Sequence, residues 1–248
     1  MNKIRLDQWL VNKNYFSSRA KAQEAIANGH VKSDKMVDLK SSLKVDDTFT
    51  VTVNNEMQRY VSRAAYKLLA AIKLFNPKIQ DGSFLDIGAS TGGFTQILLE
   101  YGAKQVTAID VGHDQFSPLL INDPRVTLHE GVNARFLNTT HLNDNVDGVV
   151  ADVSFISLKL ALPPALNFVK NGGFAILLVK PQFESEKKFL NKQGVITCEK
   201  TAQAIAEELK NWLSNLPYWQ NVKLEKCPLK GKNGNQEFIL FGIKNATK

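Results

Sequence analysis

The chain has 248 residues, a hydrophobic fraction of 44% and a formal net charge of +7, from 31 Lys and Arg against 24 Asp and Glu. This composition excludes a disordered or fibrous chain, and the basic surplus favours a polyanionic partner. We see no apolar leader core and no apolar run of bilayer length, so we expect a cytoplasmic protein with no stable membrane association. Neither the two cysteines, Cys198 and Cys227, nor the four histidines have metal-ligand spacing, so no metal site is predicted.

Residues 1–55 have the pattern of a small separate domain. Apolar residues at helical spacing predict a helix across residues 4–10, and Ser17-Ser18 precedes a second helical pattern. Residues 47–53 alternate between polar and apolar side chains, as a half-buried strand does. We expect an α+β domain of two short helices and a few small strands, followed by a linker over residues 56–62.

Basic residues are concentrated in this domain, where Lys and Arg outnumber acidic residues six to two over the first 32 positions. Arg5, Arg19 and Lys21 fall near predicted helix starts, where cations oppose the helix dipole and are mildly unfavourable. Local stability therefore does not explain them. Phosphate binding would explain them, and a solvated basic face is the alternative.

The same stretch resembles the S4-like (alpha-L) RNA-binding module. The matching positions are Arg5-Leu6-Asp7, Leu10, Ser17-Ser18-Arg19-Ala20-Lys21-Ala22, Ile26, Gly29-His30-Val31 and Asp46-Asp47. The resemblance implies that structured RNA is the partner and that the contacts come from Arg5, Arg19, Lys21 and Lys32.

From Tyr60 onward, strand and helix patterns alternate, which predicts a parallel sheet covered by helices on both faces. The candidate strands are residues 84–87, 106–111, 126–130, 148–153 and 174–180. The last two segments, 222–226 and 237–243, are predicted to pair antiparallel. We therefore expect an α/β fold over residues 63–248, a Rossmann-like sheet that ends in an antiparallel hairpin, as in class I methyltransferases.

A glycine-rich turn, residues 88–93, joins the first strand of this sheet to a helix. Glycines let a ligand approach the backbone, and a helix N-terminus presents free N–H groups to it. The turn lacks the full G-x-G-x-x-G spacing, so a dinucleotide is not expected. Asp110 closes the next strand about 20 residues later, where such folds bind ribose hydroxyls. We expect S-adenosylmethionine as cofactor; a glycine turn in an unrelated α/β domain is the alternative.

Four ionisable residues are candidates for catalysis. Lys180 and Asp152 end two apolar strands, whose carboxyl ends should meet at one crevice. Lys67 lies in a predicted helix before the glycine turn, and Glu237 opens the last strand. A ribose hydroxyl is a poor nucleophile, so two lysines with two carboxylates suit 2′-O-methylation. Taken one at a time, these residues have ordinary structural explanations. Lys67 alone would more often be a solvated lysine on a helix, Asp152 could cap the following turn, and Glu237 alone indicates no function.

These motifs resemble the TlyA ("hemolysin A") family of ribosomal RNA 2′-O-methyltransferases, which have an FtsJ-like catalytic domain. The matching stretches are residues 60–63, 67–68, 85–95, 110–112 with Gln115, 123–126, 133–135, 151–158, 179–184, 234–235 and 237–238. The family's two glycines after Ser62-Arg63 are Ala64-Ala65 here. Its Arg-x-Trp-Val element, present in some members, is Gln58-Arg59-Tyr60-Val61.

The resemblance implies S-adenosylmethionine-dependent methylation of a cytidine ribose in ribosomal RNA or ribosomal subunits. Lys180 would be the general base, with Lys67, Asp152 and Glu237 shaping its charge and holding the hydroxyl. Asn133 would lie near the adenine. The cofactor-binding residues would be Asp86, Gly88, Ala89, Ser90, Thr91, Gly92, Gly93, Phe94, Asp110, Asn133 and Asp152.

Three alternatives stay open. A non-catalytic RNA-binding or ribosome-assembly factor would not need the four ionisable residues, and a membrane-active hemolysin would need a spanning or strongly amphipathic segment. Base methylation would usually need a catalytic cysteine or an Asn-Pro-Pro-Tyr-like loop, and neither is evident. Near the predicted crevice, an RNA track or ordinary solvated loops would explain Lys187, Lys188, Lys192, Lys226, Lys230 and Lys232.

Overall fold

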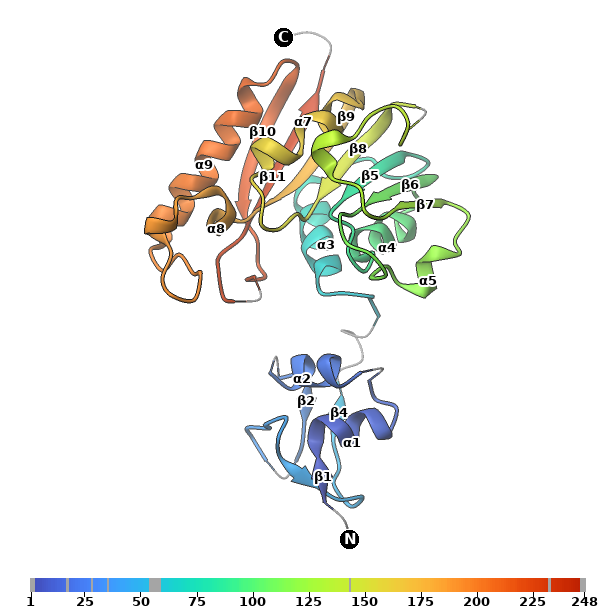
Figure 1. The fold of residues 1–248 in the computed structure, drawn as a ribbon, viewed down its shortest axis with the longest axis vertical. Coiled ribbons are helices and arrows are strands. Elements are labelled where there is room, and N and C mark those ends of the chain that lie inside the picture. Colours follow the sequence, from blue (N-terminus) through green and yellow to red (C-terminus); the bar gives the residue numbers. More distant parts are fainter. Residues whose placement is uncertain are drawn as a thin grey trace. The chain divides into compact units, whose positions relative to one another are not determined.

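The computed structural model describes residues 3–16, 18–27, 29–34, 36–53, 59–142, 144–231 and 233–245. The chain divides into two compact units, Met1–Arg59 and Tyr60–Lys248 (Figure 1). Residues 56–58 of the predicted linker lie outside the described residues, as do Ser17 of the N-terminal motif and Lys232.

The first unit is a small α+β domain. Its elements are β1 (Ile4–Arg5), α1 (Leu6–Asn12), α2 (Arg19–Ala27), β2 (Val31–Lys32), β3 (Lys44–Val45) and β4 (Thr52–Val53). β1 pairs with β3 and β2 with β4, both antiparallel. Both helices pack their apolar faces into one core, formed by Leu6, Trp9, Leu10, Ala22, Ala25, Ile26, Val31 and Val45.

The strand predicted over residues 47–53 is wrong for most of its length, because only Thr52–Val53 forms a strand. Asp46 Oδ1 accepts hydrogen bonds from both the backbone N and Oγ1 of Thr48, at 3.1 and 2.6 Å. This side-chain turn offers the backbone an alternative to a strand ladder.

The second unit is built on a seven-stranded sheet in the order β10-β11-β9-β8-β5-β6-β7 (Figure 1). Its strands are β5 (Ser83–Ile87), β6 (Gln105–Ile109), β7 (Val126–His129), β8 (Val146–Ala151), β9 (Val169–Val179), β10 (Trp219–Lys226) and β11 (Phe238–Lys244). From β9 to β7 the neighbours are parallel. β11 pairs antiparallel with both β9 and β10, which confirms the predicted hairpin and the predicted α/β fold.

Helices cover both faces of this sheet. They are α3 (Ala64–Phe75), α4 (Gly93–Glu100), α5 (Pro118–Ile121), α6 (Leu158–Ala161), α7 (Pro163–Asn167), α8 (Pro181–Glu184) and α9 (Glu199–Asn215), with the 3-10 turns η2 (Ala134–Phe136) and η3 (Lys187–Phe189). Helices α3, α4 and α5 contribute to one core cluster, and α6, α7 and α9 to the other. Successive strand residues alternate between the two clusters, as the two-residue period of a strand requires. Because both faces of the sheet are covered, the ends of the strands are where the sheet stays open to a ligand.

Candidate active site

The four predicted catalytic residues meet at the carboxyl-end edge of the parallel strands. Asp152 follows β8 directly, and Lys180 follows β9 directly. Glu237 immediately precedes β11, whose first residue is paired with the last residue of β9. Lys67 lies near the start of α3. Because β8, β9 and β11 are neighbours in the sheet, residues far apart in the sequence are brought to one place.

Their side chains form an alternating series of charges, which we call the charge chain (Glu237, Lys67, Asp152 and Lys180). Lys67 Nζ lies 2.7 Å from Glu237 Oε2 and 3.4 Å from Asp152 Oδ2. The other oxygen of Asp152, Oδ1, lies 2.6 Å from Lys180 Nζ. Both lysines are 8% exposed and Glu237 is 2% exposed. Every charge therefore has an opposite neighbour, which is the condition for burying such groups.

The ionisation of the charge chain follows from these contacts. Burial lowers the pKa of Lys67, but Asp152 and Glu237 outweigh that effect, so the pKa lies above its ordinary value. Burial raises the pKa of Asp152, but Lys180 and Lys67 outweigh it, so that pKa lies below its ordinary value. Lys67 and Asp152 are therefore both charged at neutral pH, and neither is suited to accept a proton from a hydroxyl there.

Lys180 has a second oxygen partner besides Asp152. Its Nζ donates a hydrogen bond of 2.8 Å to Ser154 Oγ. Sequence reasoning did not identify this contact, because a serine in a loop gives no signal beyond its place two residues after Asp152.

A cavity of about 520 Å³ lies beside the charge chain, which is within the ~300–1,000 Å³ range of small-molecule sites. Its walls come from the ends of β5, β6 and β8 and the segments after them. The polar residues that line it are Ser90, Asp110, Gln115, Asn133, Asp152 and Ser154. Its apolar walls include Ile87, Ile109, Val111, Val132, Val153, Phe155 and Ile156. Asp152 thus belongs to both the cavity and the charge chain.

The glycine turn forms one wall of the cavity. Gly88 has a φ of +80°, and a Cβ there would lie 2.9 Å from the backbone O of Asp152. Asp110 holds the turn from the other side, since its carboxylate accepts from the backbone N of Ser90 and of Gly112, both at 2.7 Å. One carboxylate therefore joins the glycine turn to the loop after β6.

Five of the predicted cofactor-binding residues line the cavity: Gly88, Ser90, Asp110, Asn133 and Asp152. Asn133 also begins η2, because its Oδ1 accepts from the backbone N of Arg135 at 3.1 Å. The other predicted cofactor-binding residues do not line the cavity, and these are Asp86, Ala89, Thr91, Gly92, Gly93 and Phe94. Phe94, for example, lies in the first turn of α4, is 2% exposed and packs in the core.

Asp86 joins the end of β5 to the first turn of α4. It is 1% exposed and accepts from the backbone N and Oγ1 of Thr95, at 2.9 and 2.7 Å. Burial raises the pKa of Asp86 to about 7, although the bonds from Thr95 oppose the shift. Asp86 therefore holds β5 and α4 together on either side of the glycine turn.

Phe155 is a site residue that the sequence analysis did not single out. It lines the cavity with a φ of +63°, and it is 90% exposed. Its ring lies 4.9 Å from that of Phe183, which follows Lys180 by three residues. An exposed aromatic side chain gives no distinct sequence signal, because apolar residues are ordinarily counted toward the core.

In the N-terminal unit, Arg5 and Arg19 have a structural role that the sequence analysis denied them. Both pair with Asp7, whose side chain is fully buried, at 3.0 and 3.2 Å. Gln23 Nε2 donates to the same carboxylate at 2.5 Å. Hydrogen bonds from Arg5 chiefly hold the pKa of Asp7 well below its ordinary value. The expectation that local stability does not explain these arginines is therefore wrong, because they neutralise a buried charge.

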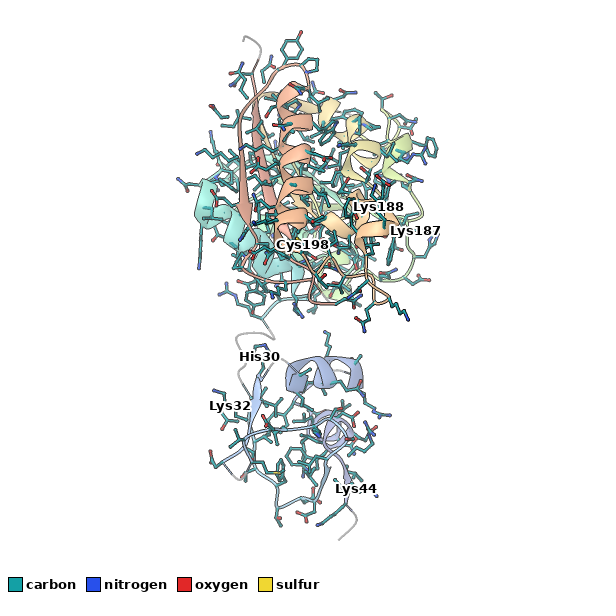
Figure 2. All side chains as sticks on the ribbon, turned by 90° about the vertical axis from the view of Figure 1, so that its left-hand side faces the viewer. His30, Lys32, Lys44, Lys187, Lys188 and Cys198 are labelled. Atoms are coloured by element: carbon teal, nitrogen blue, oxygen red, sulfur yellow. The ribbon has the colours of Figure 1, made fainter. Side chains whose placement is uncertain are left out.

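The other basic candidates lie on exposed positions. Lys21 and Lys32 are exposed in the N-terminal unit, and Figure 2 labels Lys32 there and Lys187 and Lys188 in the second unit. Lys188 pairs with Glu186 at 3.0 Å. An ion pair between exposed side chains is weak, so it does not prevent Lys188 from contacting another anion.

Two absences apply to the described part of the chain. No group of three or more His, Cys, Asp or Glu side chains there could hold a metal ion. None of the helices described is long and apolar enough to cross a membrane.

Comparison with known proteins identifies the family of the chain. The model of the FtsJ-like methyltransferases matches residues 60–244, and that of the S4 domain matches residues 4–47. The 16S/23S rRNA (cytidine-2′-O)-methyltransferase TlyA of Mycobacterium tuberculosis is 38% identical, over 96% of this chain and 89% of that protein. Hemolysin A of Brachyspira hyodysenteriae is also 38% identical, over 97% of this chain and 100% of that protein.

A solved structure is similar to this protein over the whole chain. A protein provisionally assigned as a hemolysin from Streptococcus thermophilus superposes with a TM-score of 0.77 and 32% identity, over 100% of this chain and 90% of that chain. The similarity to these relatives thus spans both units of the protein. The chain belongs to the FtsJ-like methyltransferases and, among them, to the TlyA family of S4-domain proteins.

Proposed function

We propose that this chain transfers a methyl group from S-adenosylmethionine to the 2′-hydroxyl of a cytidine ribose in ribosomal RNA. The observation that carries the proposal is the charge chain, which shares Asp152 with a cavity of small-molecule size. The Mycobacterium tuberculosis relative is named for this reaction on 16S and 23S rRNA, and a Campylobacter jejuni relative, 37% identical, for the reaction on 23S rRNA. An rRNA substrate agrees with the cytoplasmic location that the sequence predicts.

The cavity fits a nucleoside cofactor better than a phosphate-bearing one. Asp110 and Asp152 bring two carboxylates to its wall, and carboxylates bind hydroxyl or ammonium groups but repel phosphates. Gly88 lets the turn approach the backbone of Asp152 closely, and both residues line the cavity. We therefore assign Gly88, Ser90, Asp110, Asn133 and Asp152 to holding S-adenosylmethionine, which supplies the electrophilic methyl group.

Lys180 is the residue best placed to accept the proton of the ribose hydroxyl. Its Nζ is held between Asp152 and Ser154, at the end of β9 beside the cavity. Lys67 shares the Asp152 carboxylate with Lys180, and Asp152 and Glu237 together raise the pKa of Lys67 and keep it charged. In the step, Lys180 acts as the neutral amine: the ribose oxygen takes the methyl group, the hydroxyl proton passes to the lone pair of Lys180 Nζ, and Lys67 stays a fixed cation.

The N-terminal unit supplies the RNA affinity. Lys21 and Lys32 are exposed, and Arg5 and Arg19 each keep guanidinium N–H donors beyond those that Asp7 uses. Arginine and lysine contacts to phosphates position an RNA without reading its sequence. The proposal therefore assigns recognition to the first unit and chemistry to the second.

Transfer of labelled methyl groups to unmodified ribosomal subunits tests the proposal, with the modified nucleotide mapped. A general base typically contributes 10²- to 10⁴-fold, so Lys180→Ala should lower kcat at least about 100-fold, whereas S-adenosylmethionine affinity should change several-fold at most. Lys170→Ala is the control, because Lys170 lies at the opposite end of the same strand and pairs with Asp147 on the surface.

Each outcome is decisive for one part of the proposal. A label on a ribose 2′-hydroxyl that is lost in Lys180→Ala establishes the reaction and its base. A label on a base atom would overturn the 2′-O assignment. Substantial activity in Lys180→Ala would remove Lys180 as proton acceptor, and failure of the wild-type chain to bind S-adenosylmethionine would favour a non-catalytic RNA-binding factor.

A further inference from the structure

We propose that Glu184 is a positioning residue for methyl transfer, which holds the loop after β8 in the shape that aligns Asp152 and Ser154 with Lys180. The inference rests on the proposed function, but its structural basis lies outside the charge chain. Glu184 is the last residue of α8, and it is neither part of the charge chain nor among the residues that line the cavity.

The carboxylate of Glu184 joins two segments that each carry a member of the charge chain. Its Oε2 accepts from Ser157 Oγ at 2.5 Å, and its Oε1 accepts from the backbone N of Leu158 at 2.8 Å. Ser157 and Leu158 close the loop that begins at Asp152, whereas Glu184 closes the segment that begins at Lys180. We call this pair of hydrogen bonds the Glu184 clasp.

The loop that the clasp closes is under conformational constraint. Phe155, in its middle, has a φ of +63°, a region in which a residue with a Cβ is strained. Such a residue persists only where its surroundings hold it in place. The loop is anchored at one end by Asp152 and Ser154 on Lys180, and at the other by the Glu184 clasp.

The same loop forms a wall of the cavity. Its residues 152–156 all line the cavity, so a change in loop shape alters both the cofactor site and the oxygens around Lys180 Nζ. Misplacing a reacting group by about 1 Å can cost about 100-fold in rate. Loss of the clasp should therefore affect catalysis more than it affects folding.

Capping of α6 accounts for only one part of the Glu184 clasp, the hydrogen bond from Leu158 N, which is the first N–H of that helix. The helix that follows the loop, α6, already has a cap, because Ser157 Oγ accepts from the backbone N of Lys159 at 3.2 Å. Burial raises the pKa of Glu184, with the hydrogen bonds from Leu158 N and Ser157 Oγ and then the Lys159 charge acting against this shift. A neutral glutamine would be less costly to bury, so Glu184→Gln should fold at least as well as the wild-type chain.

The experiment compares Glu184→Ala, Glu184→Gln and the wild-type chain in full-length form. We expect kcat of Glu184→Ala to fall about 10- to 100-fold, with the KM for RNA little changed and the Kd for S-adenosylmethionine several-fold higher. Glu184→Gln keeps a carbonyl oxygen for Leu158 N and an amide that can donate to Ser157 Oγ, so it should recover most of the lost kcat. Glu207→Gln is the matched control, a surface glutamate on α9 that pairs with Lys210.

A double-mutant cycle with Ser157→Ala tests the clasp itself. If the two residues act through their hydrogen bond, the double variant should lose about as much kcat as Glu184→Ala alone. Fully multiplicative losses would overturn the clasp, as would wild-type kcat and S-adenosylmethionine affinity in Glu184→Ala. A loss of kcat that only follows the fraction of unfolded protein, without rescue by Glu184→Gln, would also overturn the positioning role.

The outcome can be separated from failure of the proposed function. S-adenosylmethionine binding is measured without RNA, so it reports on the cavity wall even if no RNA substrate is methylated. A wild-type chain that binds the cofactor but transfers no methyl group refutes the proposed reaction. In that case, unchanged cofactor affinity in Glu184→Ala refutes the clasp, and weakened affinity that Glu184→Gln restores supports it.

Discussion

Asp152 is the residue on which the candidate site depends most. One carboxylate oxygen pairs with Lys180 and the other with Lys67, and the same residue lines the cavity. Removing one member of a buried ion pair leaves an uncompensated charge, at a typical cost of about 3–5 kcal/mol. Loss of activity on mutating Asp152 would therefore mix a folding effect with a catalytic one. Lys180→Ala leaves Asp152 paired with Lys67, and Glu184→Gln leaves every member of the charge chain in place, so both are better probes.

Asp86 gives the second unit a characteristic pH dependence. The pKa of Asp86 is raised to about 7 in the folded protein, and the unfolded value is about 3.9. Between these two pH values the folded state binds the extra proton, so the contribution of Asp86 to stability is lost as pH rises from about 4 to about 7. The slope reaches at most about 1.4 kcal/mol per pH unit.

Asp86→Asn should remove this dependence, because an amide carbonyl can still accept from Thr95 but does not titrate. We expect the free energy of unfolding of the wild-type chain to fall more steeply between pH 5 and pH 7 than that of Asp86→Asn, as measured by denaturant titration at several pH values. Parallel pH profiles for the two proteins would show that Asp86 is ionised in the folded state.

At the scale of elements, the glycine turn depends on backbone shape rather than on side chains. Gly88 combines a positive φ with close approach to the backbone of Asp152. Gly194 has a similar φ of +74°, but a Cβ there would meet nothing within 4 Å. The two positions therefore separate the cost of a positive φ from the cost of a steric clash.

We expect Gly194→Ala to lower the free energy of unfolding by about 1–2 kcal/mol and to leave S-adenosylmethionine affinity unchanged. Gly88→Ala should destabilise the protein by more than this, because the Asp152 backbone must also move, and it should weaken cofactor binding at least about 10-fold. Calorimetric titration of both variants with S-adenosylmethionine measures the difference. Equal affinities in Gly88→Ala and Gly194→Ala would contradict the close approach at the turn.

For the whole molecule, the proposed function divides recognition and chemistry between two units. Arg19 and Lys21 lie on the same helix, α2. Arg19 pairs with the buried Asp7, whereas Lys21 has no ion-pair partner among the described residues. Substituting Lys21 should therefore remove a phosphate contact alone. Substituting Arg19 should remove a phosphate contact and part of the neutralisation of a buried carboxylate.

Lys21→Ala should raise the KM for RNA and reduce the salt dependence of binding by about one ion, with kcat and melting temperature unchanged. Arg19→Ala should do the same and also lower the stability of the N-terminal unit by about 1 kcal/mol, since Arg19 is half-exposed and Arg5 still pairs with the buried Asp7. Filter binding across a salt series, with thermal melts of both variants, checks this. An unchanged salt slope in both would exclude this helix from the RNA contact.

Sequence reasoning predicted the second unit well and the details of the first less well. Long apolar strands such as β9 are determined by local periodicity, and the antiparallel β11 was recognised in the same way. The strand expected at residues 47–53 failed because one side-chain turn at Asp46 outcompeted a weak alternating pattern. For Arg19 the sequence suggests phosphate binding or a solvated basic face. Its pairing with Asp7 links two helices and has no local signature.

The sequence by itself determined the succession of strands and helices along the chain, the glycine turn and the choice of the four ionisable residues. These follow from spacing, residue type and family resemblance. Only the tertiary structure decided which charges meet. Lys67 and Asp152 are 85 positions apart, and Ser157 and Glu184 are 27 apart. Contacts over such separations depend on strand register and on how helices pack across a sheet, which the local pattern of a sequence does not specify.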